Sequence, residues 1–368
     1  MSPVEIAITA AAFLTFIMLV FIFMFFTTTG LGKRKEREFN FPGTEKLHDL
    51  YREAGVTCPE AYAIPGVNAL LEQIRQAITD GSLLRARVLA NLVGELKQEP
   101  EYCPRELRQV LLPDLHQLKG PVDEPMVFSR VAHPAMKHPL TPVLATLAAP
   151  LLSAQCAPAG AFDLRGEHRA SNRRRMEPVL GMVYQLSHLL LSFEPELYDQ
   201  EEDLDLLHVN SQQLGMWVPS LVVGRRFLAR PEEQQLVLIA RKLALFRPEF
   251  RILTAFPTEA SFMDLVDLLA HVRAGRWERI LGWNRVQPAS RELCTEALKA
   301  LPEVDCEALQ QWRKGALLTC SRLALLVTGQ WAPMRTILAE ESDPGVRVDL
   351  MSYLSGEHFH EALLQLRS

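Results

Sequence analysis

The chain has 368 residues, of which 48% are apolar, 23% charged and 8% aromatic, and its formal net charge is -5. These proportions are those of a globular protein, so they exclude collagen-like and largely disordered chains, and the length allows about two domains. The net negative charge argues against a nucleic-acid-binding protein, so no nucleic-acid partner is expected.

The first segment is strongly apolar and contains no charged residue between Ile6 and Phe26. As a helix, this stretch is roughly 30 Å long, which matches the hydrocarbon thickness of a bilayer. A basic region before the stretch and a clear small-x-small cleavage site after it are both missing, which argues against a cleaved signal peptide. We therefore expect residues 1–32 to be an uncleaved transmembrane anchor, with the lipid bilayer as a partner.

The charges that flank this segment predict its orientation. Lys33, Arg34, Lys35 and Arg37 follow it, whereas residues 1–5 contain no Lys or Arg. The positive-inside rule then places the amino terminus outside and the large soluble domain in the cytoplasm. The six cysteines form no C-x-x-C pair, which argues against a disulfide framework or a zinc ribbon and agrees with a reducing compartment.

Residues 33–65 are polar and contain several prolines, so they are predicted to form a juxtamembrane tether. Apolar residues then recur at helical spacing over residues 70–78 and 83–96, with the break Asp-Gly-Ser between them, which predicts two antiparallel helices. A third helix is expected over residues 104–118. We assign residues 66–120 to a helical hairpin unit and place a domain boundary near residue 120.

Residues 121–368 are predicted to form the second domain. Apolar helices are expected over residues 141–155 and 177–193, with a loop between them, and further helices over most of residues 232–367. Short strands are expected over residues 204–209 and 220–223. The predicted fold class is mainly α with a small β element (α+β).

Familiar local motifs of catalysis are absent, including H-E-x-x-H, the Walker loop, G-x-S-x-G and G-x-G-x-x-G. His358 and His360 have the spacing of a strand or loop ligand pair but lack a third ligand nearby. The acidic run at residues 201–205 lacks the glycine of a calcium loop, so a solvated loop is expected. An enzyme with an unrecognised site stays open as an alternative, and its candidate residues are His133, His138 and His168.

A basic cluster precedes the helix expected at residues 177–193; its members are Arg169, Arg173, Arg174 and Arg175. Positive charge at a helix start opposes the helix dipole, so the cluster is unusual for a purely helical role. The two interpretations are a solvated surface and a binding face for an acidic partner.

The most informative stretch is Pro-Ser-Leu-Val-Val-Gly at residues 219–224, followed by the apolar helix expected at residues 232–246. It resembles the core of the membrane-associated zinc metallopeptidases related to the HtpX heat-shock peptidase and the CAAX prenyl endopeptidases, as found attached to helical-repeat proteins of bacteria. In that family a strand of this kind leads into the helix that carries H-E-x-x-H. The resemblance implies a zincin-like, mostly helical domain over residues 121–368.

The same resemblance implies that the catalytic residues have been lost. Ala240 and Ala244 stand where the family has its two histidine ligands, and Arg241 stands where it has the glutamate general base. On the later ligand helix, Leu317 replaces the glutamate ligand and Ser321 replaces the aspartate. Such a domain binds no zinc, so no cofactor is expected. A simpler interpretation is that Ala240 and Ala244 form the small-residue face of a buried helix.

In the peptidases, the strand before the active-site helix helps to line the substrate cleft. The matching residues here are Ser220, Leu221, Val222 and Val223. If the cleft still captures an extended peptide by strand addition, these residues are the candidates for partner binding.

These observations predict a membrane-anchored, catalytically inactive metallopeptidase-like protein at the inner membrane of a bacterium. It is expected to be a scaffold or regulator that binds other proteins at the cytoplasmic face. The alternative is a helical adapter without peptidase ancestry, in which the hairpin unit binds the partner, and the third possibility is the enzyme considered above.

Overall fold

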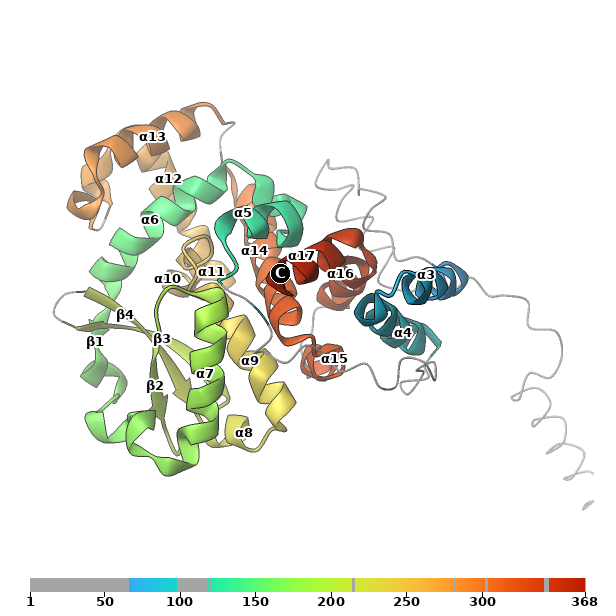
Figure 1. Cartoon of the computed structure of the whole chain (residues 1–368). Helices are drawn as coiled ribbons and strands as arrows, with labels where there is room; N and C mark the ends of the chain where they lie inside the picture. The colour runs from blue at the N-terminus through green and yellow to red at the C-terminus, as the bar shows by residue number, and fades with distance from the viewer. Residues whose placement is uncertain are drawn as a thin grey trace, which may run out of the picture. The chain divides into compact units, whose positions relative to one another are not determined.

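The computed structural model describes residues 66–97, 118, 121–213, 216–280, 282–301, 304–340 and 344–367 (Figure 1). The chain divides into two units, Met1–Glu45 and Lys46–Ser368, and all described residues belong to the second. In these described ranges no helix is both long enough and apolar enough to cross a membrane. The predicted anchor, the tether and most of the helix expected at residues 104–118 lie outside them.

The predicted helical hairpin is confirmed for its first two helices, α3 (Val67–Thr79) and α4 (Leu83–Lys97). The connection turns at Gly81, whose φ of 73° is in the left-handed region that glycine adopts without a steric penalty. Leu70, Ile74 and Ala77 form the buried stripe of α3. The second helix of the hairpin contacts α16 (Pro344–Ser355), so the C-terminal part of the chain supports the hairpin.

The mainly α fold with a small β element is confirmed. Its sheet has four strands in the order β1-β3-β4-β2. They are β1 (Ala157–Pro158), β2 (Glu196–Asp199), β3 (Leu206–Gln213) and β4 (Met216–Val223). Strands β3 and β4 form an antiparallel hairpin, whereas β1 runs parallel to β3 and β2 runs parallel to β4.

The hairpin extends the two strands that the sequence predicted. In the half of the hairpin where Asn210–Gln213 face Met216–Pro219, one strand is polar throughout and the other apolar, so neither shows an alternating pattern, and the predicted strands at residues 204–209 and 220–223 were too short. Strands β1 and β2 were missed altogether. Both are too short to show a period of their own, and only pairing with longer neighbours makes them strands.

The two faces of the sheet have different covers. On the helical face, the Phe246 ring contacts the rings of His208 and Trp217, with centroids 6.4 and 6.3 Å apart. On the opposite face, which we call the loop face, Tyr198 and Val222 pack against Leu164. The loop face is therefore covered by the segment between β1 and α7 (Glu177–Leu190), while α7 and α9 (Glu232–Leu245) lie together on the helical side (Figure 1).

The remaining elements of residues 121–367 are mainly helical, as predicted. Two agree closely with the sequence: α6 (Leu140–Gln155), and α7, which ends three residues earlier than expected because Leu191 is extended. The others include the short segments α5 (Glu124–Met126), η4 (Val127–Val131) and η5 (Pro134–Lys137), and the helices α8 (Arg225–Leu228), α10 (Ile252–Ala255), α11 (Glu259–Met263), α12 (Leu265–Arg273), α13 (Pro288–Lys299), α14 (Cys306–Thr328), α15 (Trp331–Glu340) and α17 (Glu357–Arg367).

Helix α14 is a central element of the core, because its second half is buried on all sides. Its start is fixed by Asp305, whose side chain accepts a hydrogen bond of 2.8 Å from the Ala308 N–H. Its end is fixed by Gly329, which adopts the left-handed conformation at φ 64°. Contacts with α9, α16 and η5 make this helix the element on which the candidate site is built.

Candidate functional site

Helix α9 carries three of the positions that the peptidase resemblance singled out. Glu232 and Glu233 lie in its first turn, where negative charge is favourable to the helix dipole. Ala240 and Ala244 are both fully buried, one turn apart, on the side of the helix that enters the core. Arg241, between them in sequence, is half-buried.

Helix α14 packs directly on α9 and carries the other two positions. Leu317 is half-buried, and Ser321 is buried with its hydroxyl donating to the Leu317 carbonyl oxygen at 3.1 Å. Burial raises the pKa of the neighbouring Cys320 thiol, and the charge of Arg241 on the facing helix partly opposes this rise. The structure thus brings the two helices that carry these positions together, with Arg241 beside the turn of Cys320.

The chemistry of this contact differs from that of a zinc centre. Zinc needs nitrogen, oxygen or sulfur donors, and Ala240, Ala244 and Leu317 contribute only hydrocarbon. Across the described ranges, no group of three or more His, Cys, Asp or Glu residues is placed to hold a metal ion. An apolar helix contact is predicted equally by a degenerate peptidase and by an ordinary core.

The four strand residues proposed for partner binding require a correction. Ser220, Leu221, Val222 and Val223 pair with β2 on one side and with β3 on the other, and all four are buried. Because both edges of this part of β4 are occupied, a peptide cannot add to it. The sequence could not reveal this, since the second neighbour is the unpredicted strand β2.

The free edge belongs to β3 instead. Proline has no N–H, so Pro219 and its partner Asn210 must form a pair that is not hydrogen-bonded. Pairs of this kind occur at every second residue of an antiparallel ladder, so His208 and Leu221 form another one. The backbone N–H and C=O of His208 therefore point away from β4. In the described part of the chain, β1 pairs only with Ser211 and Gln212, so no strand lies beside residues 206–210. Burial, with a smaller effect of the Lys242 charge, lowers the pKa of His208 to about 4.

The basic cluster is largely neutralised by acidic residues within the chain. Asp199 at the end of β2 is fully buried. Arg175 binds both of its oxygens at 2.8 Å, and Arg173 lies 3.5 Å from it. Arg169 donates to the Glu196 carboxylate at 2.7 Å. Arg174, the fourth arginine, is exposed. The arginines therefore form ion pairs with acidic residues of β2, a strand that follows them by about 25 residues in the chain.

The acidic run at residues 201–205 is used in the same structural way. Asp205 accepts from Arg230 at 2.6 Å, and the same guanidinium binds Glu340 at the end of α15 at 2.7 Å. Glu201 lies 3.5 Å from Arg173. The expectation of a simply solvated loop was therefore wrong. Through these ion pairs the run joins β3, the start of α9 and α15.

The candidate histidines lie in three separate environments. The Nδ1 atom of His133 accepts from the Ala135 N–H at 3.2 Å, and that of His138 accepts from the Leu140 N–H at 3.2 Å. His168 contacts the Asp163 carbonyl oxygen at 3.0 Å. The structure does not bring them to one site.

The other histidine pair also differs from the expectation. His358 and His360 lie in helix α17 and not in a strand or loop. Residues two positions apart on a helix point to different sides, so their side chains do not converge on one ion. His358 is instead 3.5 Å from Glu361, one turn further along the helix.

Sequence reasoning missed one concave site, a pocket of about 480 Å³ on the loop face of the sheet. Its polar lining comes from three separate segments, the turns at residues 166–172 and the strands β2 and β3. Among the residues that line it are Arg169, Asn172, Glu196, Tyr198, Ser211 and Gln213. No local sequence motif predicts such a pocket. The only feature of the sequence that pointed to this region was the cluster of arginines that includes Arg169.

Comparison with known proteins adds no relative. No protein-family model matches the chain, and no curated protein and no solved structure shows a significant match to it. The resemblance to the zinc metallopeptidases therefore rests on the residues of the β4–α9 segment and of α14.

Proposed function

We infer that this protein is a membrane-anchored, catalytically inactive relative of the HtpX and CAAX-type zinc metallopeptidases. In this role it holds other proteins at the cytoplasmic face of a bacterial inner membrane. The observation that carries the proposal is the order of the elements, in which β4 leads through a short turn into α9, together with the packing of α9 on α14. This is the arrangement of strand, active-site helix and ligand helix that the resemblance implies.

The inactive character follows from the residues at the helix contact. A catalytic zinc needs three protein ligands, and its bound water needs a carboxylate that accepts the proton. The fully buried methyl groups of Ala240 and Ala244 offer no lone pair. Arg241, in the place of the general base, carries a positive charge that repels a cation and accepts no proton at neutral pH.

Binding is proposed to use the free edge of β3 at residues 206–210. The N–H and C=O of His208 point away from β4, as the pairing with Pro219 requires. An extended peptide that adds there gains main-chain hydrogen bonds, while neighbouring side chains select its sequence. Leu207, which is 46% exposed, is the apolar side chain next to this edge that a partner residue can cover.

Site-specific photo-crosslinking in the full-length, membrane-embedded chain tests this proposal. A benzophenone amino acid at Leu207 should capture a discrete partner, whereas the same group at Leu293, an exposed leucine on α13, should not. Capture from both positions, or from neither, contradicts binding at β3. Capture at Leu83, which is exposed on the α3–α4 hairpin, favours the helical adapter instead.

A further inference from the structure

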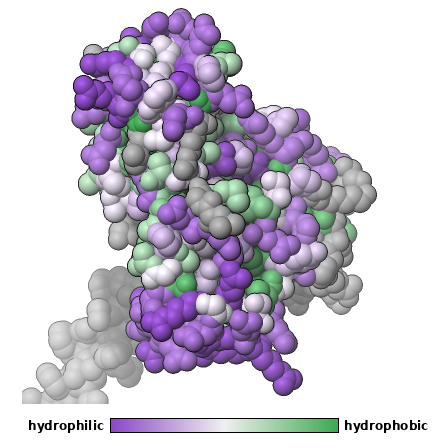
Figure 2. All heavy atoms as spheres, turned by 90° about the vertical axis from the view of Figure 1, so that its left-hand side faces the viewer, coloured by the Kyte–Doolittle hydropathy of each residue, from purple (hydrophilic) through white to green (hydrophobic). Residues whose placement is uncertain are grey.

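The pocket on the loop face is separate from the α9–α14 contact and includes none of residues 206–210 of β3 in its lining. Its floor is formed by β2, β3 and β4, and its wall by the turns between β1 and α7. From the β register, residues 196 and 198 of β2 and residues 211 and 213 of β3 share this face of the sheet. Figure 2 shows the side of the molecule that lies on the left in Figure 1, and hydrophilic residues gather on its lower part.

The polar groups of the floor are held in place before any ligand arrives. The Glu196 carboxylate accepts from the Arg169 guanidinium at 2.7 Å on one oxygen and from the buried Tyr198 hydroxyl on the other. The hydroxyls of Ser211 and Ser220 lie 3.3 Å apart, and both residues are buried. A ligand therefore meets fixed donors and acceptors, which lowers the entropic cost of binding.

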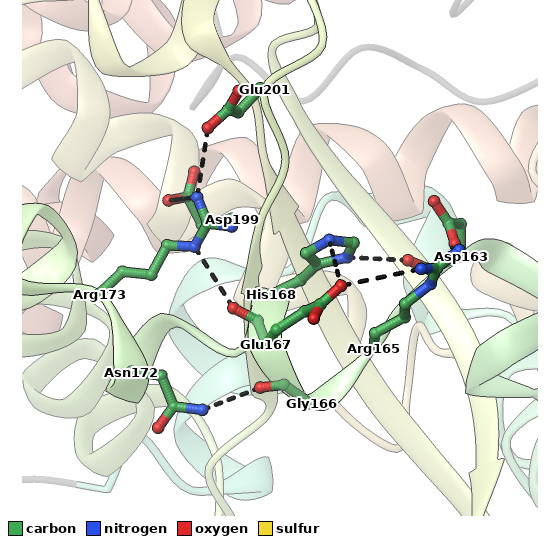
Figure 3. Close-up of polar contacts among 9 residues, drawn as sticks. All are labelled: Asp163, Arg165, Gly166, Glu167, His168, Asn172, Arg173, Asp199 and Glu201. Carbon is green, nitrogen blue, oxygen red and sulfur yellow. Dashed lines mark hydrogen bonds and ion pairs between the residues drawn. The ribbon is translucent and has the colours of Figure 1, made fainter.

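The wall is equally well supported, by a network of contacts within the turns (Figure 3). Asn172 donates to the Gly166 carbonyl oxygen at 2.8 Å, which leaves its own amide oxygen available as an acceptor. Arg165 binds Asp163 at 2.9 Å, and Arg173 donates to the Glu167 carbonyl oxygen at 3.4 Å. These contacts fix the backbone that faces the pocket.

The charge of the lining limits the class of ligand. Among the lining residues the charged ones are Arg169 and Glu196, which neutralise each other. The other polar lining groups are hydroxyls and amides, which donate and accept without net charge. A strongly charged ligand gains no counter-ion here, and an apolar ligand leaves these polar groups unpaired.

The position of the pocket limits the ligand further. It lies on a face of the sheet and not along an edge, so the strands offer it side chains and no row of backbone groups. A polypeptide that binds by strand addition is therefore a poor fit. We propose that this pocket binds a small, uncharged polyhydroxylated molecule, such as a neutral mono- or disaccharide, through Arg169, Glu196, Ser211 and Asn172.

The proposal is tested with the full-length protein in lipid nanodiscs prepared without sugar-based detergent. Titration with glucose and with maltose, followed by calorimetry or saturation-transfer NMR, should give saturable binding with a dissociation constant in the millimolar range. Ser211→Ala should weaken it about fivefold, the usual effect of losing one hydrogen bond. Glu177→Gln, at an exposed position outside the pocket, should leave it unchanged.

Two charge variants separate a specific site from a folding defect. Glu196→Gln leaves the Arg169 charge unpaired and should shift the preference from glucose to glucuronate, whereas Arg169→Gln should shift it to glucosamine. Opposite shifts cannot arise from general loss of structure. The proposal is overturned if neither sugar binds saturably, if the pocket variants bind as the parent does, or if a short neutral peptide binds in place of the sugars.

Discussion

Removal of Asp349 should strongly destabilise the domain, because this residue neutralises a buried arginine. Arg322 of α14 donates two hydrogen bonds to it from Nε and Nη2, the first at 2.8 Å, and each side chain is 1% exposed. The same guanidinium donates to the Val131 carbonyl oxygen at 3.2 Å and lies over the Tyr353 ring at 5.0 Å. The pair therefore joins α14, α16 and η4.

Asp349→Ala leaves the Arg322 charge in the core without this carboxylate, and breaking such a buried pair costs about 3 to 5 kcal/mol. That is a large part of the roughly 5 to 15 kcal/mol that stabilises a typical domain. In urea, with a slope of about 3 kcal/mol per molar, the unfolding midpoint should fall by about 1 to 2 M. Tryptophan fluorescence can follow the transition, since Trp312 is buried in α14.

A matched control is Glu72→Ala, which removes the exposed ion pair with Arg75 on α3 and should cost less than about 1 kcal/mol. The double variant Arg322→Met/Asp349→Leu should recover much of the loss, because it removes both buried charges. A midpoint for Asp349→Ala that matches that of Glu72→Ala would refute the reasoning.

Three further predictions concern the core, the sheet and the α9–α14 contact. Burial lowers the pKa of His133 from 6.5 to about 4, so the unfolded chain binds the extra proton between these pH values. The contribution of this histidine to stability should be complete above pH 6.5 and fall by on the order of 3 kcal/mol towards pH 4. Urea midpoints measured across this range should therefore fall less steeply in His133→Gln, while His208, whose pKa burial also lowers to about 4, keeps part of the decrease. A Cβ at Gly224 would overlap the Leu204 carbonyl oxygen, so Gly224→Ala should lower the melting temperature by several degrees, whereas Gly181→Ala, where a Cβ meets open space, should not. Elemental analysis of the purified protein should find no stoichiometric zinc, and one zinc per chain would contradict the inactive assignment.

Local features of the fold were predictable because they depend on residues close in sequence. Helix α6 was expected from Thr141 and begins at Leu140, and the turn at Gly81 was expected from its Asp-Gly-Ser sequence. In both cases an apolar period of three to four residues, bounded by a break, is enough to define the helix. The strands of the hairpin were found only where their residues are apolar.

The candidate site was less predictable because it depends on which segments become neighbours. Val222 looked like part of a peptide-binding strand, yet β2 inserts parallel to β4 and closes that edge. The four residues of β2 follow a proline and show no alternation that a sequence pattern detects. The resulting correction moves the open edge to the other strand of the same hairpin, at His208.

The arginines before α7 show why a charge pattern alone misleads. From the sequence, Arg173 and Arg175 are expected on the surface. In the structure they form ion pairs with Asp199 of β2, because a buried carboxylate is costly unless a positive charge neutralises it. Once these charges are paired, the segment covers the loop face, and Arg169 can fix Glu196 in the floor of a neutral pocket. The pairing of these arginines with β2 therefore removes a basic binding face and at the same time creates a neutral pocket. Both results depend on the strand order, which places β2 beside β4.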